Sequence, residues 1–172
     1  MGDLRDQVRD GRTALETLME TIPGFKGYQE KEDRRDADKL LRMHLVGLLS
    51  SASEQLSRAQ AKLSAEGQFK PITDLNRLGR RLVRTRDRIE HASYGYAGFF
   101  DALKIEAAEL DRLYEFDVAL EQHVAAVVAA AAQVGKSAAD QRAEAVSALA
   151  DALDNLDHVV DQRQEAAAQL GS

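Results

Sequence analysis

The chain has 172 residues, of which 44% are hydrophobic and 30% are charged, with a net charge of −6, two prolines and no cysteine. This composition predicts one folded domain over residues 1–172, and it excludes disulfides, thiolate metal sites and cysteine nucleophiles. The polar N-terminal sequence MGDLRDQVRDGR lacks the apolar segment of a secretory signal, so we expect a cytoplasmic protein.

Charge is distributed unevenly along the chain. Residues 1–102 carry 18 Lys/Arg against 16 Asp/Glu, a net of +2, whereas residues 103–172 carry 5 against 13, a net of −8. The acidic half disfavours binding to nucleic acid and makes contact with an anionic membrane less favourable. It also predicts that the two halves attract each other.

Apolar residues recur at spacings of three and four through most of the chain, which is the pattern of amphipathic α-helices. A first helix is expected over residues 3–22, ending at Pro23-Gly24, and a second over 28–66, with Gly67 as its C-terminal cap. A third helix is expected over 73–93. Its apolar seam consists of Leu75, Leu78, Leu82, Thr85, Ile89 and Ala92.

Two long helices follow, over residues 101–134 and 137–170, with Ser137 as the N-cap of the second. Each has roughly 30 residues and is therefore about 45 Å long at 1.5 Å per residue. The short turn Gly135-Lys136-Ser137 makes them antiparallel. The predicted fold is an all-α, elongated bundle of about five helices with a long C-terminal antiparallel hairpin that resembles a coiled coil.

Aromatic residues cluster around two glycines in YGYAGFFDALKI, residues 94–105. Such a loop either plugs the open end of the bundle or forms an exposed platform for a partner, and the sequence leaves both readings open. A second glycine-flanked aromatic stretch lies at residues 22–28. The predicted partner-binding residues from the two stretches are Phe25, Tyr28, Tyr94, Tyr96, Phe99 and Phe100.

Arginines crowd the third predicted helix, and the fourth predicted helix is acidic. Phosphate or nucleic-acid binding is one interpretation of the arginines, but pairing with acidic residues of the same chain requires no further partner. We expect Arg81, Arg84 and Arg88 to organise the fourth helix through ion pairs. Glu106 and Asp117 complete this predicted set, because both occupy positions where the seam of the fourth helix requires apolar residues.

A buried carboxylate must be paired, protonated or bound to a metal. A ferritin-like metal site would use Glu106, Asp117 and His44, but the Glu-x-x-His repeat of such sites is missing from the sequence. We therefore predict no metal and no cofactor. An acidic stripe on the fifth predicted helix is expected to face solvent: Asp151, Asp154, His158, Asp161 and Glu165.

The stretches IPGFKGYQEKEDRRDADKLLR (residues 22–42) and YGYAGFFDALKIEAAELDRLYEFD (residues 94–117) cover about a quarter of the chain. Together they resemble an uncharacterised family of bacterial all-helical proteins. The resemblance implies a helical fold, and it implies no activity, cofactor, ligand or functional residue.

Sequence motifs for phosphate-binding loops, hydrolase nucleophiles, zinc sites and calcium loops are missing from the chain. We therefore expect a non-enzymatic helical scaffold or protein–protein interaction module that forms homo-oligomers and binds another protein. Two alternatives remain open. One is a helical hairpin protein that associates peripherally with membranes, and the other is a ferritin-like bundle that binds metal through carboxylates.

Overall fold

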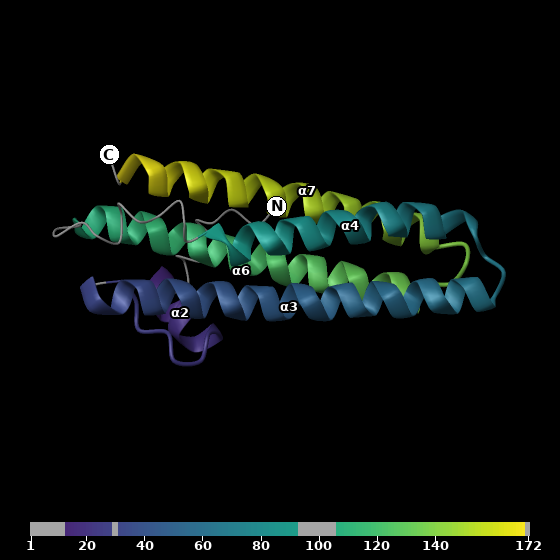
Figure 1. The fold of residues 1–172 in the computed structure, drawn as a ribbon, viewed down its shortest axis with the longest axis horizontal. Coiled ribbons are helices and arrows are strands. Elements are labelled where there is room, and N and C mark those ends of the chain that lie inside the picture. Colours follow the sequence, from purple (N-terminus) through teal and green to yellow (C-terminus); the bar gives the residue numbers. More distant parts are fainter. Residues whose placement is uncertain (1–12, 29–30, 93–105, 171–172) are drawn as a thin grey trace.

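A computed structural model describes residues 13–28, 31–92 and 106–170, and within these ranges the chain forms helices and no strand. The helices in chain order are α2 (Ala14–Thr21), α3 (Lys31–Ala65), α4 (Lys70–Glu90), α6 (Ala107–Lys136) and α7 (Arg142–Leu170). The predicted all-α fold is confirmed (Figure 1).

The four long helices lie side by side along the long axis of the molecule (Figure 1). α6 packs against α7 on one side and α3 on the other, while α4 packs against α3 and, less extensively, against α7. Each long helix therefore has two neighbours, as in a four-helix bundle. The short helix α2 packs against α6.

Leucine, valine and alanine seams fill the centre of this bundle. The predicted seam of α4 is buried from Leu75 to Ile89, including Thr85. Along α3, Leu49 is fully buried, whereas Leu48 is only partly buried. Complete burial of one such side chain stabilises a fold by about 1.5–3 kcal/mol, so these seams dominate the packing energy.

Several helix ends differ from the predicted ones. α4 begins at Lys70, three residues before the predicted start, because Pro71 is tolerated in the first turn of a helix. α3 begins at Lys31 and not at residue 28, since Tyr28 lies in a bend. Gly67 ends α3 with a φ of +71°, which confirms its predicted capping position.

Ser137 ends α6 and does not begin α7, which corrects its predicted N-cap role. Its backbone N–H donates to the Gln133 carbonyl at 2.9 Å, and its hydroxyl donates to the same carbonyl at 2.5 Å. The connection to α7 therefore extends over residues 137–141. Arg142 closes this turn by donating from Nη2 to the Ser137 carbonyl at 2.7 Å.

The predicted starts of the first and fourth helices, at residues 3 and 101, lie outside the described residues, and the observed helices begin just after those ranges. Thr13 forms a capping box with Glu16 and begins α2 at Ala14, and the earlier part of the first predicted helix lies outside the described residues. Glu106 has extended backbone angles and is the N-cap of α6, so this helix begins at Ala107. Residues 101–105 of the predicted fourth helix also lie outside the described ranges.

Candidate functional site

The segment between α2 and α3 folds into the end of the bundle. Gly24 and Gly27 have φ values of +82° and +92°, a conformation in which side chains other than glycine are strained. These turns place the rings of Phe25 and Tyr28 inside the core, where they are only 3% and 0% exposed. Neither ring offers surface to a partner, which corrects the predicted partner-binding role of these two residues.

Tyr28 is held by two residues of α6. Its ring stacks on that of Tyr114, with centroids 5.4 Å apart, and meets Phe25 edge-on at 5.6 Å. Its backbone N–H donates to the Tyr114 hydroxyl at 2.7 Å, and its own hydroxyl donates to Oδ2 of Asp117, also at 2.7 Å. Two polar groups of this buried residue are therefore satisfied from α6, and its backbone carbonyl accepts a 2.8 Å hydrogen bond from Nε of Arg34 on α3.

Asp117 is the centre of a buried polar network that joins the four long helices. Arg163 of α7 donates from Nε to Oδ1 of Asp117 at 2.5 Å and from Nη2 to Oδ1 of Asp38 at 3.2 Å. Asp38 of α3 also accepts a 2.7 Å hydrogen bond from Nε of Arg42. Arg42 in turn donates to the carbonyl of Glu90 at the end of α4, so the network reaches all four long helices.

Burial governs the electrostatics of this network, hereafter the Asp117 network (Tyr28, Asp38, Arg42, Asp117 and Arg163). Burial raises the pKa of the Asp117 carboxyl above its ordinary value of 3.8, while the Arg163 guanidinium and the Tyr28 hydroxyl act in the opposite direction. Burial also raises the pKa of the Tyr28 hydroxyl well above its ordinary value of 10.0, and the Asp117 charge raises it further. Tyr28 is therefore a neutral donor to Asp117 at physiological pH.

Sequence reasoning identified Asp117 as a buried, paired carboxylate, and the structure confirms both properties. Its expected partner was an arginine of the third helix, whereas the actual partner is Arg163 of α7. Arg163 lies between Val160 and Ala167 on the buried seam of α7, and Asp38 follows Ala37 on α3. Charged residues at seam positions of three helices were the signal that would have revealed the network.

Helix α4 forms its ion pairs with α7 and not with α6. Arg81 contacts Asp154 at 2.5 Å and Asp157 at 2.7 Å, and the Thr85 hydroxyl donates to Asp157 at 2.7 Å. Arg88 pairs with Asp161 and lies 3.6 Å from Asp157. The predicted pairing of Arg81 and Arg88 is confirmed, but the predicted partner helix is wrong because α4 neighbours α7 in the bundle.

Two of the predicted ion-pair residues form no such pair with any residue that the structure describes. Arg84 is exposed and makes no ion pair with any described residue. Glu106 is also exposed, and its backbone N–H and side chain form a capping box with Glu109. Its expected place in the seam is wrong because the helix begins one residue later, which leaves Glu106 at the end and outside the core.

The structure does not bring together the residues of the alternative prediction, a ferritin-like metal site. Both oxygens of Asp117 accept hydrogen bonds from Tyr28 and Arg163, while Glu106 lies at the exposed start of α6. Among the described residues, no group of three or more His, Asp or Glu side chains is arranged to hold a metal ion. Tyr94, Tyr96, Phe99 and Phe100, the other predicted partner-binding residues, lie outside the described ranges.

A groove of about 510 Å³ runs along the outer surface between α3 and α4. Ser53 and Ser57 of α3 line one side, and Gln60 bridges the two helices by donating to Asn76 at 3.0 Å. Gly79 lies in the wall formed by α4, and a Cβ atom built there meets no atom within 4 Å. The groove is thus open to solvent above a helical glycine.

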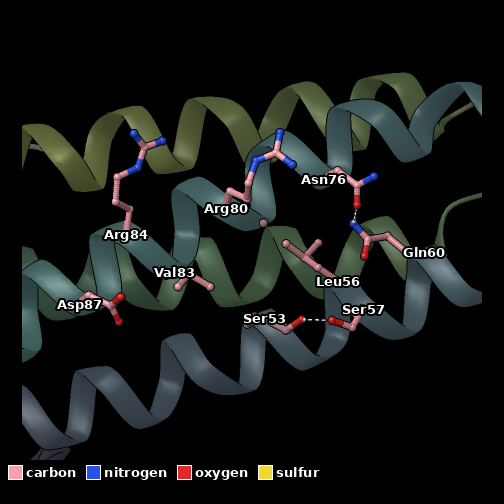
Figure 2. Close-up of a pocket in the computed structure, with 10 residues that line it drawn as sticks. Ser53, Leu56, Ser57, Gln60, Asn76, Arg80, Val83, Arg84 and Asp87 are labelled. Carbon is pink, nitrogen blue, oxygen red and sulfur yellow. Dashed lines mark hydrogen bonds between the residues drawn. The ribbon is translucent and has the colours of Figure 1, made fainter.

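Figure 2 shows how the two arginines of this groove are placed. The side chains of Arg80 and Arg84 extend from α4 away from Ser53 and Ser57, along the outer rim. Both side chains are exposed and neither pairs with a described carboxylate. The groove, which hereafter we name the α3–α4 groove, therefore has a mixed lining in which Leu56 and Val83 lie among polar side chains. Its charged residues are Arg80, Arg84 and Asp87.

Helix α6 is the one described helix that is long and apolar enough to cross a membrane by length and composition. Its most apolar window has a mean hydropathy of 1.3, and 39% of that window is buried inside the bundle. A core helix of a bundle has the same length and composition, because the residues of its seam are apolar and pack against other helices. The seam of α6 from Leu113 to Val134 is buried in this way.

Comparison with protein-family models, curated proteins and solved structures gives no match for this chain. The resemblance of residues 22–42 and 94–117 to a bacterial all-helical family therefore stays a prediction.

Proposed function

We propose that the protein is a non-enzymatic helical scaffold that associates with itself. The observation that carries this proposal is the charge difference between two halves of the bundle. The α3–α4 half, from Lys31 to Glu90, has 14 Lys/Arg against 9 Asp/Glu, a net of +5, whereas residues 107–170 have 4 against 12, a net of −8. Surfaces of opposite charge on one molecule attract each other between copies.

The pairing inside one molecule uses only part of this charge. Asp157 and Asp161 of α7 neutralise Arg88, and Asp154 and Asp157 neutralise Arg81. Arg80 and Arg84 still face solvent on the basic side. The remaining charges of both signs are therefore available for contacts between molecules.

The Asp117 network supports a structural and not a catalytic role. Its members donate to and accept from one another inside the core, and each is less than 10% exposed, so no substrate reaches them. In some proteins, buried ionic groups select one arrangement of helices more than they add stability, and we propose this role for the Asp117 network. A bundle with a fixed helix register suits a scaffold.

Light scattering coupled to size-exclusion chromatography tests the proposal. We expect the mass to exceed the 18.9 kDa of one chain at tens of micromolar protein in low salt, and to approach it on dilution. Because the attraction is between exposed charges, about 0.5 M NaCl should shift the equilibrium towards the monomer. A mass of one chain at every protein and salt concentration would overturn the proposal.

Peripheral membrane association is a second candidate, favoured by the outer face of α6. Ala125, Ala126 and Ala129 are exposed there, and no charged residue occurs between Glu121 and Lys136. Flotation with vesicles of neutral lipid tests this candidate. Co-flotation that Ala126→Glu/Ala129→Glu abolishes would support it, and an unchanged bottom fraction for the wild type would exclude it.

A further inference from the structure

We propose that the α3–α4 groove of one molecule receives the acidic outer face of α7 from a second copy of the chain. This inference rests on the self-association proposed above and names the two surfaces that meet. The first surface consists of Arg80, Arg84 and Gly79 of α4 with the polar residues of α3 that face them. The second consists of exposed acidic residues of α7: Glu144, Asp151, Asp154, Asp161 and Glu165.

The α3–α4 groove has the shape that a docking helix requires. Helices pack by placing a ridge of side chains into a groove on their partner, and a glycine permits the closest approach. Gly79 offers this open position in the wall of the groove, because apart from the adjoining residues of its own helix no atom lies within 4 Å of its potential Cβ. A glycine inside a helix destabilises it by roughly 1 kcal/mol relative to alanine, and the packing of this molecule gives no reason for one here.

The charges of the groove rim are also free to pair with a second molecule. Arg80 and Arg84 are one helical turn apart, so their guanidinium groups lie on the same side of α4. Both are exposed, and within the described ranges neither forms an ion pair. Arg81, in contrast, points towards α7 of its own molecule and is already paired.

The outer face of α7 supplies complementary charges at helical spacing. Glu144 and Asp151 are seven residues apart, as are Asp154 and Asp161, so each pair lies about two turns apart on the same side. Glu144 and Asp151 are exposed and form no ion pair with a described residue. Asp154 and Asp161 pair with α4 of their own molecule yet remain 63% and 58% exposed.

A second copy is the occupant that these charges select. Two basic grooves repel each other, as do two acidic α7 faces, so a symmetric contact of either surface with itself is disfavoured. The groove and the α7 face share no residue, so each molecule uses both at once. Because each contact joins unlike surfaces, two molecules that exchange both contacts form a two-fold dimer, and molecules that make each contact with a different neighbour form a closed ring or an open filament.

A charge-swap experiment tests these two surfaces directly. One variant, Arg80→Glu/Arg84→Glu, reverses the groove rim, and another, Glu144→Lys/Asp151→Lys, reverses part of the α7 face. All four side chains are exposed and outside the internal ion pairs, so circular dichroism should show folded protein in both cases. We expect each variant alone to associate at least about tenfold more weakly than the wild type at low salt. Both surfaces of the first variant are acidic, and the net charge of the α7 face of the second falls from −5 to −1.

An equimolar mixture of the two variants is the decisive sample. The reversed groove rim of the first variant faces the two introduced lysines of the second, and the unchanged surfaces fit each other, so association should rise well above that of either variant alone and towards the wild-type level. If the wild type associates but both variants keep its affinity, the docking surface is wrong while self-association stands. If the wild type is a monomer under all conditions, the proposed function itself fails and this inference fails with it.

Two glycines provide a matched steric control. Gly47 of α3 and Gly79 of α4 are both helical, and a Cβ atom at either position meets no atom within 4 Å. Gly79→Gln places a side chain in the groove, whereas Gly47 does not line it. We expect Gly79→Gln to weaken association and Gly47→Gln to leave it unchanged. Equal effects of the two substitutions would overturn the proposed role of the groove.

Discussion

The hydroxyl of Tyr28 donates a 2.7 Å hydrogen bond to the carboxylate of Asp117, which lies 89 residues further along the chain. The contact fixes the segment between α2 and α3 to the N-terminal half of α6. Because Arg163 binds the other oxygen of the same carboxylate, the segment is linked to α7 as well. One buried carboxylate thus sets the relative positions of an N-terminal loop and two long helices.

Arg163→Met should destabilise the protein by about 3–5 kcal/mol, because it leaves the carboxylates of Asp117 and Asp38 in the core without their shared cation. Urea denaturation at pH 7 measures this loss. Arg163→Lys should lose less stability than Arg163→Met, because it keeps the positive charge. Some loss should remain, because lysine does not keep the two donors that reach separate carboxylates. Arg58→Met is the control, because Arg58 is 80% exposed and should contribute less than about 1 kcal/mol through its pair with Glu54. Equal losses for Arg163→Met and Arg58→Met would contradict the importance of the network.

Gly27→Ala should be more destabilising than the same change at Gly67. Both glycines have positive φ, so alanine costs about 1–2 kcal/mol at either position through backbone strain. At Gly27 the new Cβ atom would also lie 2.7 Å from the Tyr114 hydroxyl and 3.0 Å from Leu15, whereas at Gly67 it meets open space. Thermal unfolding of the two variants measures the difference. A loss for Gly67→Ala that matches or exceeds that for Gly27→Ala would show that the close approach to Tyr114 is unimportant.

Asp157→Ala should reduce stability by about 1–3 kcal/mol, because Asp157 accepts hydrogen bonds from both Arg81 and the buried Thr85 hydroxyl. Asp154→Ala is the matched change on the same helix. Asp154 is 63% exposed and contacts Arg81 alone, so its removal should cost less than about 1 kcal/mol. Chemical denaturation of both variants distinguishes the two roles, and a larger loss at Asp154 would contradict them.

Below neutral pH, the free energy of unfolding should decrease because His123 becomes protonated. Burial and the neighbouring His158 lower the pKa of His123 below its ordinary value of 6.5. As the pH falls, the His123 imidazole is therefore protonated in the unfolded chain before it is protonated in the folded one. The stability that depends on the neutral imidazole is complete above pH 6.5 and is lost as the pH falls through the lower pKa of the folded state.

His123→Gln should accordingly flatten the decline in stability between pH 7 and pH 5, measured by urea denaturation at each pH. His158→Gln should flatten it less, because burial of His123 is the larger cause of its lowered pKa. A slope that neither substitution changes would place the acid sensitivity elsewhere in the protein.

The helices themselves were predictable because their signal is local. Apolar residues at spacings of three and four define the seams of α4, α6 and α7, and the residues that repeat in this way are the buried ones. Capping was predictable where one residue decides it, as at Gly67. Capping was not predictable where a residue lies between two helices. Ser137 bonds to the end of α6 and therefore does not start α7.

The sequence by itself therefore determined the helical content, the core faces and the burial of a paired carboxylate at Asp117. Apart from the hairpin of α6 and α7, it did not determine which helices are neighbours, because periodicity along one helix says nothing about the element that covers its apolar face. Only the tertiary structure decided that Arg81 and Arg88 meet α7 and that Asp117 meets Arg163 and Tyr28. The same packing buried Phe25 and Tyr28 and left Arg80 and Arg84 on the rim of a groove, since burial depends on neighbours that lie far apart in sequence.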